Sequence, residues 1–225
     1  VNDEQRERQA VTSGLDFGYW RGKFNLSGNL FYSNIHESET QTGMGGLVRG
    51  NYQATRNWQL AMELISLDDK LDLNDAGYLE RNDLNSLSAS MNYQQGATRL
   101  LPSLKSLDLS LDARIAENSE GDRLPSTLAM LASFETLDNQ KLWVKLDHAS
   151  SGIDDLITRG FGNVALDSRS SWRLGYTSPF GHPVTIDLEY GRFQEGLAGW
   201  TERVTSSAKF SVTDGLSVEG SATIQ

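Results

Sequence analysis

Hydrophobic and polar residues alternate along this chain with a period of two. In the stretch KFNLSGNLFYSN, residues 23–34, Phe24 and Leu26 fall on one side of an extended backbone. Asn25 and Asn29 fall on the other side. Strict alternation of this kind is typical of a β-strand with one apolar face. The stretch therefore predicts a strand whose second face is polar but mostly uncharged.

The same alternation recurs along the whole chain. It predicts strands over residues 11–19, 24–34, 48–54, 58–64, 86–93, 107–115, 128–135, 142–147, 172–177, 184–190, 204–212 and 216–224. The typical length matches the roughly nine to eleven residues with which a tilted strand crosses a bilayer. We therefore expect an all-β fold, an antiparallel transmembrane β-barrel. Residues 1–225 would form about twelve strands of a single larger barrel domain.

The connections between these strands differ in length in a regular order. Tight turns alternate with long polar loops, which are predicted at residues 36–46, 68–85, 117–126, 148–171 and 192–203. Residues 94–106 form an intermediate connection in a position where a short one is due. Alternating short and long connections are typical of outer-membrane barrels, with the long loops outside the cell. The order also leads us to expect at least one further strand at each end of the segment.

Aromatic residues agree with this order of connections. Eight of the predicted strands carry an apolar-face aromatic near the short-turn end, and these residues are Tyr19, Phe24, Tyr52, Trp58, Tyr93, Phe134, Tyr176 and Phe210. Tyr and Trp prefer the level of the lipid headgroups. We therefore expect these side chains to form a girdle at one membrane interface. Tyr32, Trp172 and Tyr190 would form a thinner girdle at the other interface.

Charged residues on the polar face are candidates for lining the interior of the barrel. They are Arg49, Glu63, Asp108, Asp112, Arg114, Glu135, Lys145, Asp147, Arg173, Asp187, Glu189 and Lys209. One interpretation is a water-filled pore with a slight preference for cations. The other is that opposite charges pair across neighbouring strands and fill the interior. The sequence leaves both open.

Composition narrows the class of protein. The chain has 225 residues, no cysteine and a formal net charge of −10. The acidic balance argues against nucleic acid as a partner, because no basic stripe could neutralise phosphates. No apolar run reaches the roughly 18 residues of a membrane-spanning helix. A soluble β-sandwich with a binding or adhesion function also shows period-two alternation, although its exposed face is usually richer in Lys and Glu.

One segment carries a family motif. Residues 57–93 resemble a group of outer-membrane proteins in which a carbohydrate-binding module of family-nine type precedes a C-terminal β-barrel domain of unknown function. The group's loop reads F-D-x-N-D-x-G-[FY]-L-x-R-N-D, and the matching residues here are Asp72, Asn74, Asp75, Gly77, Tyr78, Leu79, Arg81, Asn82 and Asp83. Leu71 stands in place of the aromatic residue. The resemblance implies a barrel in the outer membrane of a Gram-negative bacterium, but it supplies no substrate.

Two kinds of chemistry compete with a purely structural role for the loops. Asp72, Asn74 and Asp83 have partial EF-hand spacing, but the residues at the fifth and twelfth positions do not fit a calcium site. Asp154, Asp155 and His148 are the residue types of a barrel protease rim.

The chain contains no nucleophile elbow, phosphate loop or histidine pair with metal-ligand spacing. We therefore expect a non-enzymatic protein without a cofactor. Its partners would be outer-membrane lipid and lipopolysaccharide, with a carbohydrate or another solute as candidate cargo.

Overall fold

The computed structural model describes most of the chain. The described residues are 9–37, 39–74, 81–98, 101–156, 162–179, 183–194, 199–213 and 216–225. Among them no helix is long and apolar enough to cross a membrane. The described secondary structure consists of β-strands and their connections.

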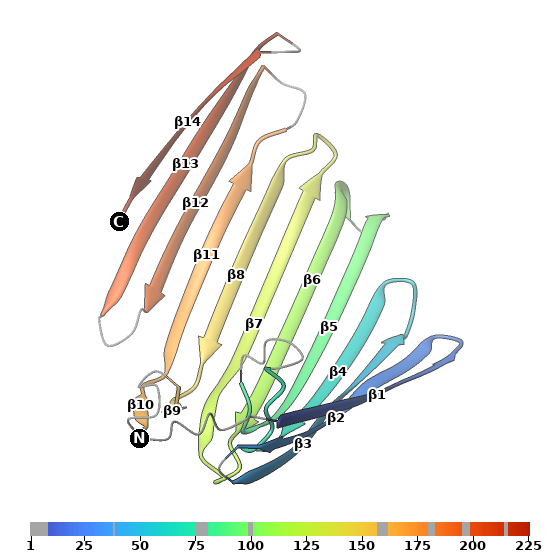
Figure 1. Cartoon of the computed structure of the whole chain (residues 1–225). Coiled ribbons are helices and arrows are strands. Elements are labelled where there is room, and N and C mark those ends of the chain that lie inside the picture. Colours follow the sequence, from blue (N-terminus) through green and yellow to red (C-terminus); the bar gives the residue numbers. More distant parts are fainter. Residues whose placement is uncertain are drawn as a thin grey trace. The chain divides into compact units, whose positions relative to one another are not determined.

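Twelve strands form one antiparallel sheet, and each pairs with its neighbours in the order β1-β2-β3-β4-β5-β6-β7-β8-β11-β12-β13-β14 (Figure 1). Their bounds are β1 Gln9–Arg21, β2 Phe24–His36, β3 Thr40–Gln53, β4 Trp58–Leu67, β5 Leu84–Thr98, β6 Leu101–Glu117, β7 Arg123–Thr136, β8 Lys141–Ala149, β11 Arg169–Thr177, β12 Val184–Gln194, β13 Trp200–Thr213 and β14 Leu216–Ile224. The prediction of about twelve antiparallel strands is confirmed. Among the described residues β1 and β14 each pair with one strand, so closure into a larger barrel stays a prediction.

Several strands are longer than the alternation predicted. Thr40 begins β3, so most of the loop predicted at residues 36–46 is strand. This prediction was wrong because Gly43, Gly45 and Gly46 interrupt the alternation of side chains without interrupting the backbone pairing. The intermediate connection predicted at 94–106 was also wrong, since β5 continues to Thr98 and β6 begins at Leu101.

The two longest connections fall where long ones were expected. They are residues 68–83, after β4, and residues 150–168, after β8. The second contains a small antiparallel pair, β9 (Gly152–Asp154) and β10 (Val164–Leu166). The other connections predicted to be long are short, because the flanking strands extend into them.

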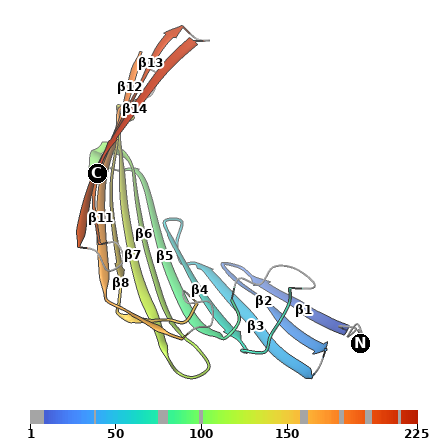
Figure 2. The same ribbon diagram turned by 60° about the vertical axis from the view of Figure 1, so that its left-hand side comes forward.

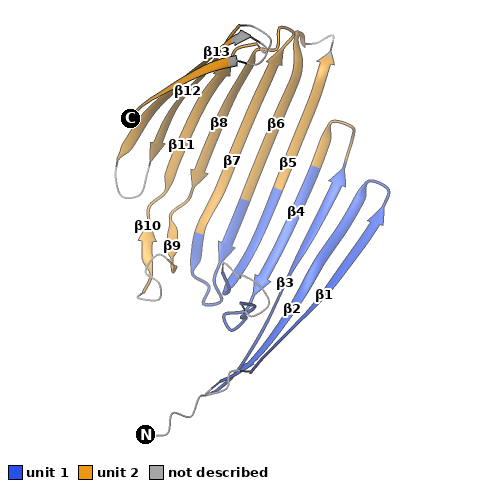
Figure 3. Ribbon diagram, turned by 45° about the horizontal axis from the view of Figure 1, so that its top comes forward, with its two compact units in different colours: residues 1–53, 60–89, 114–124 blue, residues 54–59, 90–113, 125–225 orange. Residues whose placement is uncertain are grey.

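The chain divides into two compact units, which Figure 3 colours blue and orange. Unit 1 comprises Val1–Gln53, Leu60–Ala89 and Arg114–Leu124. Within it β1, β2 and β3 lie side by side, as Figures 1 and 2 both show. The ladder is regular from Gln9↔His36 to Arg21↔Phe24, and a two-residue turn with Gly22 at φ 59° joins β1 to β2. A positive φ is easily adopted by glycine, which has no Cβ.

Unit 2 comprises Ala54–Gln59, Ser90–Ala113 and Pro125–Gln225. Within it β8 pairs with β7 on one side and with β11 on the other, so the connection 150–168 does not interrupt the sheet. β11, β12, β13 and β14 follow in sequence order. The register between β13 and β14 shifts between Ser211 and Thr213.

The apolar side chains are distributed in an unusual way for a folded chain. Among the described residues the only buried apolar side chains are Ile35, Leu71, Leu84 and Leu124 in unit 1 and Ala149 in unit 2. Many large apolar side chains at the alternating strand positions are exposed, and they include Leu15, Leu30, Met62, Leu109, Met130, Leu146, Leu188 and Val218. Monomeric soluble proteins rarely leave so much contiguous apolar surface open. The sheet therefore presents an apolar face that the described residues leave uncovered.

Candidate functional site

Side chains on the polar face of unit 1 pair across neighbouring strands. Asn25 of β2 lies opposite Asn51 of β3, and Asn51 Nδ2 donates to Asn25 Oδ1 at 3.2 Å. Asn29 donates to the carboxylate of Asp16 on β1, its register partner. These contacts place the residues opposite the apolar positions on one common surface, as the alternation predicted.

Two of the predicted interior charges form an ion pair in unit 1. The guanidinium of Arg49 on β3 contacts the carboxylate of Glu63 on β4. Both side chains keep contact with solvent. Exposed pairs of this kind contribute little to stability. Their effect on the surface is to hold neighbouring positive and negative groups in place.

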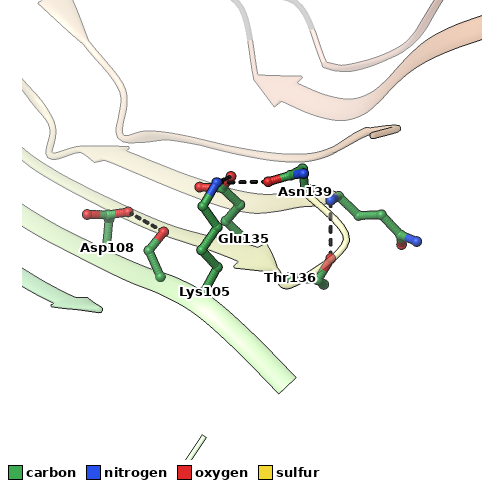
Figure 4. Close-up of polar contacts among 7 residues, drawn as sticks. Lys105, Asp108, Glu135, Thr136 and Asn139 are labelled. Atoms are coloured by element: carbon green, nitrogen blue, oxygen red, sulfur yellow. Dashed lines mark hydrogen bonds and ion pairs between the residues drawn. The ribbon is translucent and has the colours of Figure 1, made fainter. Parts of the chain in front are cut away.

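A second charged cluster lies in unit 2 where β6 and β7 approach their short turns (Figure 4). Lys105 Nζ lies 2.6 Å from Glu135 Oε1 and 2.8 Å from Asn139 Oδ1. Asn139 has φ 60°, a conformation that Asn tolerates in a tight turn. Asp108 Oδ2 accepts a long hydrogen bond from Ser106 at 3.5 Å. Lys105 was not among the predicted interior charges, because residues 94–106 were predicted to form a connection.

The largest described charge network of unit 2 spans three neighbouring strands. Asp147 of β8 lies 3.2 Å from Lys145 Nζ and 3.8 Å from Arg173 Nη2 of β11. Arg173 Nη1 also lies 3.9 Å from Glu189 Oε1 of β12. The prediction that these four residues share one face is consistent with their contacts. Opposite charges pair across the sheet and remain partly exposed to water.

The other predicted interior charges occupy less connected positions. Asp187 Oδ2 accepts a hydrogen bond from Ser207 at 3.4 Å. Lys209 of β13 lies directly opposite Glu219 of β14 in the register. Asp112 and Arg114 on β6 are exposed. The polar face therefore combines paired charges with charges open to solvent.

The polar face also carries aromatic residues, to which the sequence pattern assigned no role. Trp143 of β8 lies across Gly175 of β11, its register partner, where an added Cβ would come within 2.1 Å of the indole ring. Phe193 of β12 lies over Gly191, and Arg203 stacks on the Phe193 ring at 5.1 Å. The signal in the sequence is an aromatic residue paired with a glycine across or along a strand.

The described part of the motif loop of unit 1, residues 68–74 and 81–83, folds against the polar face of the sheet. An added Cβ on Gly43 of β3 would lie 2.2 Å from the backbone nitrogen of Leu71. Leu71 is completely buried, and the amide of Asp72 donates to Ser33 Oγ at 3.1 Å. Gln41 Nε2 donates to the carbonyl of Lys70 at 3.1 Å. The described part of this loop therefore packs on the sheet, and its expected position outside the cell stays a prediction.

The motif residues that the structure describes hold the loop in shape. The amide of Asn74 donates to Asp72 Oδ1 at 2.9 Å, which forms an Asx turn. Asn82 Nδ2 donates to the carbonyl of Asp69 at 2.6 Å and to that of Leu71 at 3.2 Å. This amide therefore ties the end of the loop to its beginning.

Arg81 and Asp83 complete the described part of the motif. Arg81 Nη2 donates to the carbonyl of Asp83 at 3.4 Å. Asp83 has φ 51°, and its carboxylate accepts the amide of Ser119 at 2.7 Å. These contacts support the structural role that the sequence favoured over calcium binding. Asp75, Gly77, Tyr78 and Leu79 lie outside the described residues.

The start of the motif loop also holds a pair of adjacent carboxyl groups. A hydrogen bond between the side chains of Asp68 and Asp69 lowers the pKa of Asp68 and raises the pKa of Asp69. Both groups are open to solvent. The pair shares a proton more readily than two separate carboxyl groups would.

The residues considered for a protease rim make other contacts. His148 Nδ1 lies 2.8 Å from Ser170 Oγ, its register neighbour on β11. Asp154 Oδ1 accepts the amide of Leu156 at 3.0 Å, as in an Asx turn. Neither of these contacts forms the pair of carboxylates about a water that such a site requires.

The aromatic residues near the short turns occupy the strand positions predicted for them. In unit 1, Phe24 lies opposite Tyr52 across β2 and β3, and both are exposed. In unit 2, the rings of Trp58 and Tyr93 are 4.6 Å apart. Trp172 and Tyr190, near the other strand ends, meet edge to face at 5.1 Å.

A comparison with protein families identifies the family of this chain. A family described as "Domain of unknown function (DUF5916)" matches residues 1–175. The chain belongs to the DUF5916 family. The DUF5916 match includes the motif loop and the strands from β1 through most of β11. No curated protein and no solved structure matches the sequence.

Proposed function

We propose that this DUF5916 chain forms part of the wall of an outer-membrane β-barrel. Its apolar face would contact lipid and lipopolysaccharide, and its polar face would line an aqueous interior that admits a carbohydrate or another polar solute. The observation that carries the proposal is the uncovered apolar face along an antiparallel sheet of twelve strands. A bilayer is the environment in which such a face is stable.

Strand length supports the same proposal. The strands of the twelve-stranded sheet have between 9 residues, in β8, β11 and β14, and 17 residues, in β6. A tilted strand needs roughly nine to eleven residues to cross the hydrocarbon region. Aromatic residues at the strand ends suit the headgroup level, where an amphipathic ring has both apolar and hydrated neighbours.

A second candidate function is a membrane anchor for an associated carbohydrate-binding module. It is favoured by the cross-strand ion pairs and by the motif loop on the polar face, since both occupy space in the interior. The two candidates share the same fold. They differ in whether the interior conducts.

Single-channel conductance of the full-length protein in a planar bilayer distinguishes these functions. For a pore we expect stable ohmic steps with a modest preference for cations, because the polar face has an acidic excess. A protein that inserts without conducting would support the anchor. A protein that stays in solution without detergent and does not insert would contradict the barrel and support a soluble adhesion or binding domain.

A further inference from the structure

The two faces of β2 and β3 are covered differently at the end where the motif loop lies. Ser33 and Gly43 are register partners on the polar face, and Ser33 is 0% exposed. Tyr32 and Met44 are the adjacent register partners on the apolar face, and Met44 is 64% exposed. Successive residues of a strand point to opposite faces, so the covered polar face and the open apolar face lie back to back at this point. The loop covers only the polar side.

The close contact between loop and strand depends on two glycines of β3. At Gly43 a Cβ would meet the backbone of Lys70 and Leu71 at 2.2–2.4 Å. At Gly45 a Cβ would lie 2.8 Å from the side chains of Leu67 and Leu71. Backbone atoms cannot move aside as a flexible side-chain end can, so only glycine allows the contact at Gly43.

The covered region has its own small apolar core. Leu71 of the loop is buried, and so are Ile35 of β2 and Leu84 of β5, which occupy polar-face positions of the same unit. A hydrophobic core on the face that otherwise carries Asn, Arg and Glu has no role in contact with lipid. It serves to hold the loop against the interior surface.

We propose that residues 68–74 and 81–83, the described parts of the motif loop, form an inward-folded constriction that narrows the passage along the polar face. The proposal rests on the barrel proposed above. The ladder of β1, β2 and β3 is made by strand pairing alone, so we expect displacement of the loop to leave it intact. The loop would then set the size of the solute that the interior admits.

The test displaces the loop in the full-length protein and compares it with a matched variant. Gly43→Ala places a Cβ against the loop backbone, whereas Gly14→Ala, on the polar face of β1, has its nearest neighbour at an ordinary 3.7 Å. Asn82→Ala is a milder variant, because it removes the two hydrogen bonds to the carbonyls of Asp69 and Leu71. Trypsin cleavage after Lys70 reports whether the loop has left the strand.

We expect cleavage after Lys70 to be about tenfold faster in Gly43→Ala, since overpacking shifts a local opening equilibrium by about that factor. The single-channel conductance of both loop variants should exceed that of the native protein and of Gly14→Ala. A silent native protein that conducts once the loop is displaced would support the proposal equally.

Two results would overturn the constriction while leaving the barrel in place. One is unchanged conductance in a variant whose Lys70 is cleaved faster. The other is a rate of cleavage after Lys70 that is unchanged in both single variants, Gly43→Ala and Asn82→Ala. That result would mean that the loop does not contact β3. Failure of every variant to insert into the bilayer would instead reject the barrel itself, and the constriction with it.

Discussion

Leu109→Arg is expected to lower the free energy of unfolding from a lipid bilayer by about 2–4 kcal/mol, the cost of a cation facing hydrocarbon near the middle of a barrel strand. Leu109 lies in the central part of β6 on the apolar face and is 38% exposed. It lines an apolar groove of about 210 Å³ together with Trp58 and Met91. The measurement is a urea titration of the protein folded into vesicles, followed by tryptophan fluorescence.

Ser110→Arg is the matched control for this experiment. Ser110 is the next residue of β6 and belongs to the polar face, where a cation can stay hydrated. We expect the loss of unfolding free energy to be far smaller than for Leu109→Arg. Equal losses at the two positions would contradict the assignment of the faces.

Leu71→Ala is expected to lower the free energy of unfolding by about 2–5 kcal/mol, the range for truncating a buried leucine. Leu71, a residue of the motif loop, is completely buried against the polar face of β3. Unlike Leu109, it owes its burial to protein contacts, so the effect should appear in detergent as well as in lipid. A urea titration in both media measures it.

Leu137→Ala is the control for the buried position. Leu137 follows β7 in a short connection and is 59% exposed. Its truncation should change the unfolding free energy by no more than about 0.5 kcal/mol. If Leu71→Ala were no more costly than this, the loop would not be packed as the structure describes.

The strands could be predicted from the sequence because their signal is local. A residue such as Leu109 belongs to a face whose alternate members are all apolar, and this alternation requires no knowledge of distant contacts. The first part of β3, from Thr40 to Leu47, was missed because alternation depends on side chains. Gly43 and Gly45 carry no side chain, so the alternation has no signal where backbone pairing continues.

The position of the motif loop could not be predicted from alternation. Its conformation depends on contacts far apart in the chain, between Leu71 and Gly43 and between Asp72 and Ser33. The charge clusters were partly predictable. Alternation placed Arg173 and Asp147 on one face, but the register that brings them within 3.8 Å depends on β8 pairing with β11 across a long connection.

The central claim is that one face of the sheet meets lipid and the other meets water. Nitroxide labels at each position from Leu107 to Ala113 of β6, in the full-length protein in vesicles, test it most directly. We expect collision with oxygen, which partitions into lipid, to peak at Leu107, Leu109, Leu111 and Ala113. Collision with a water-soluble nickel complex should peak at the positions between them. Uniform contact with the nickel complex at all seven positions, without the period of two, would contradict the claim.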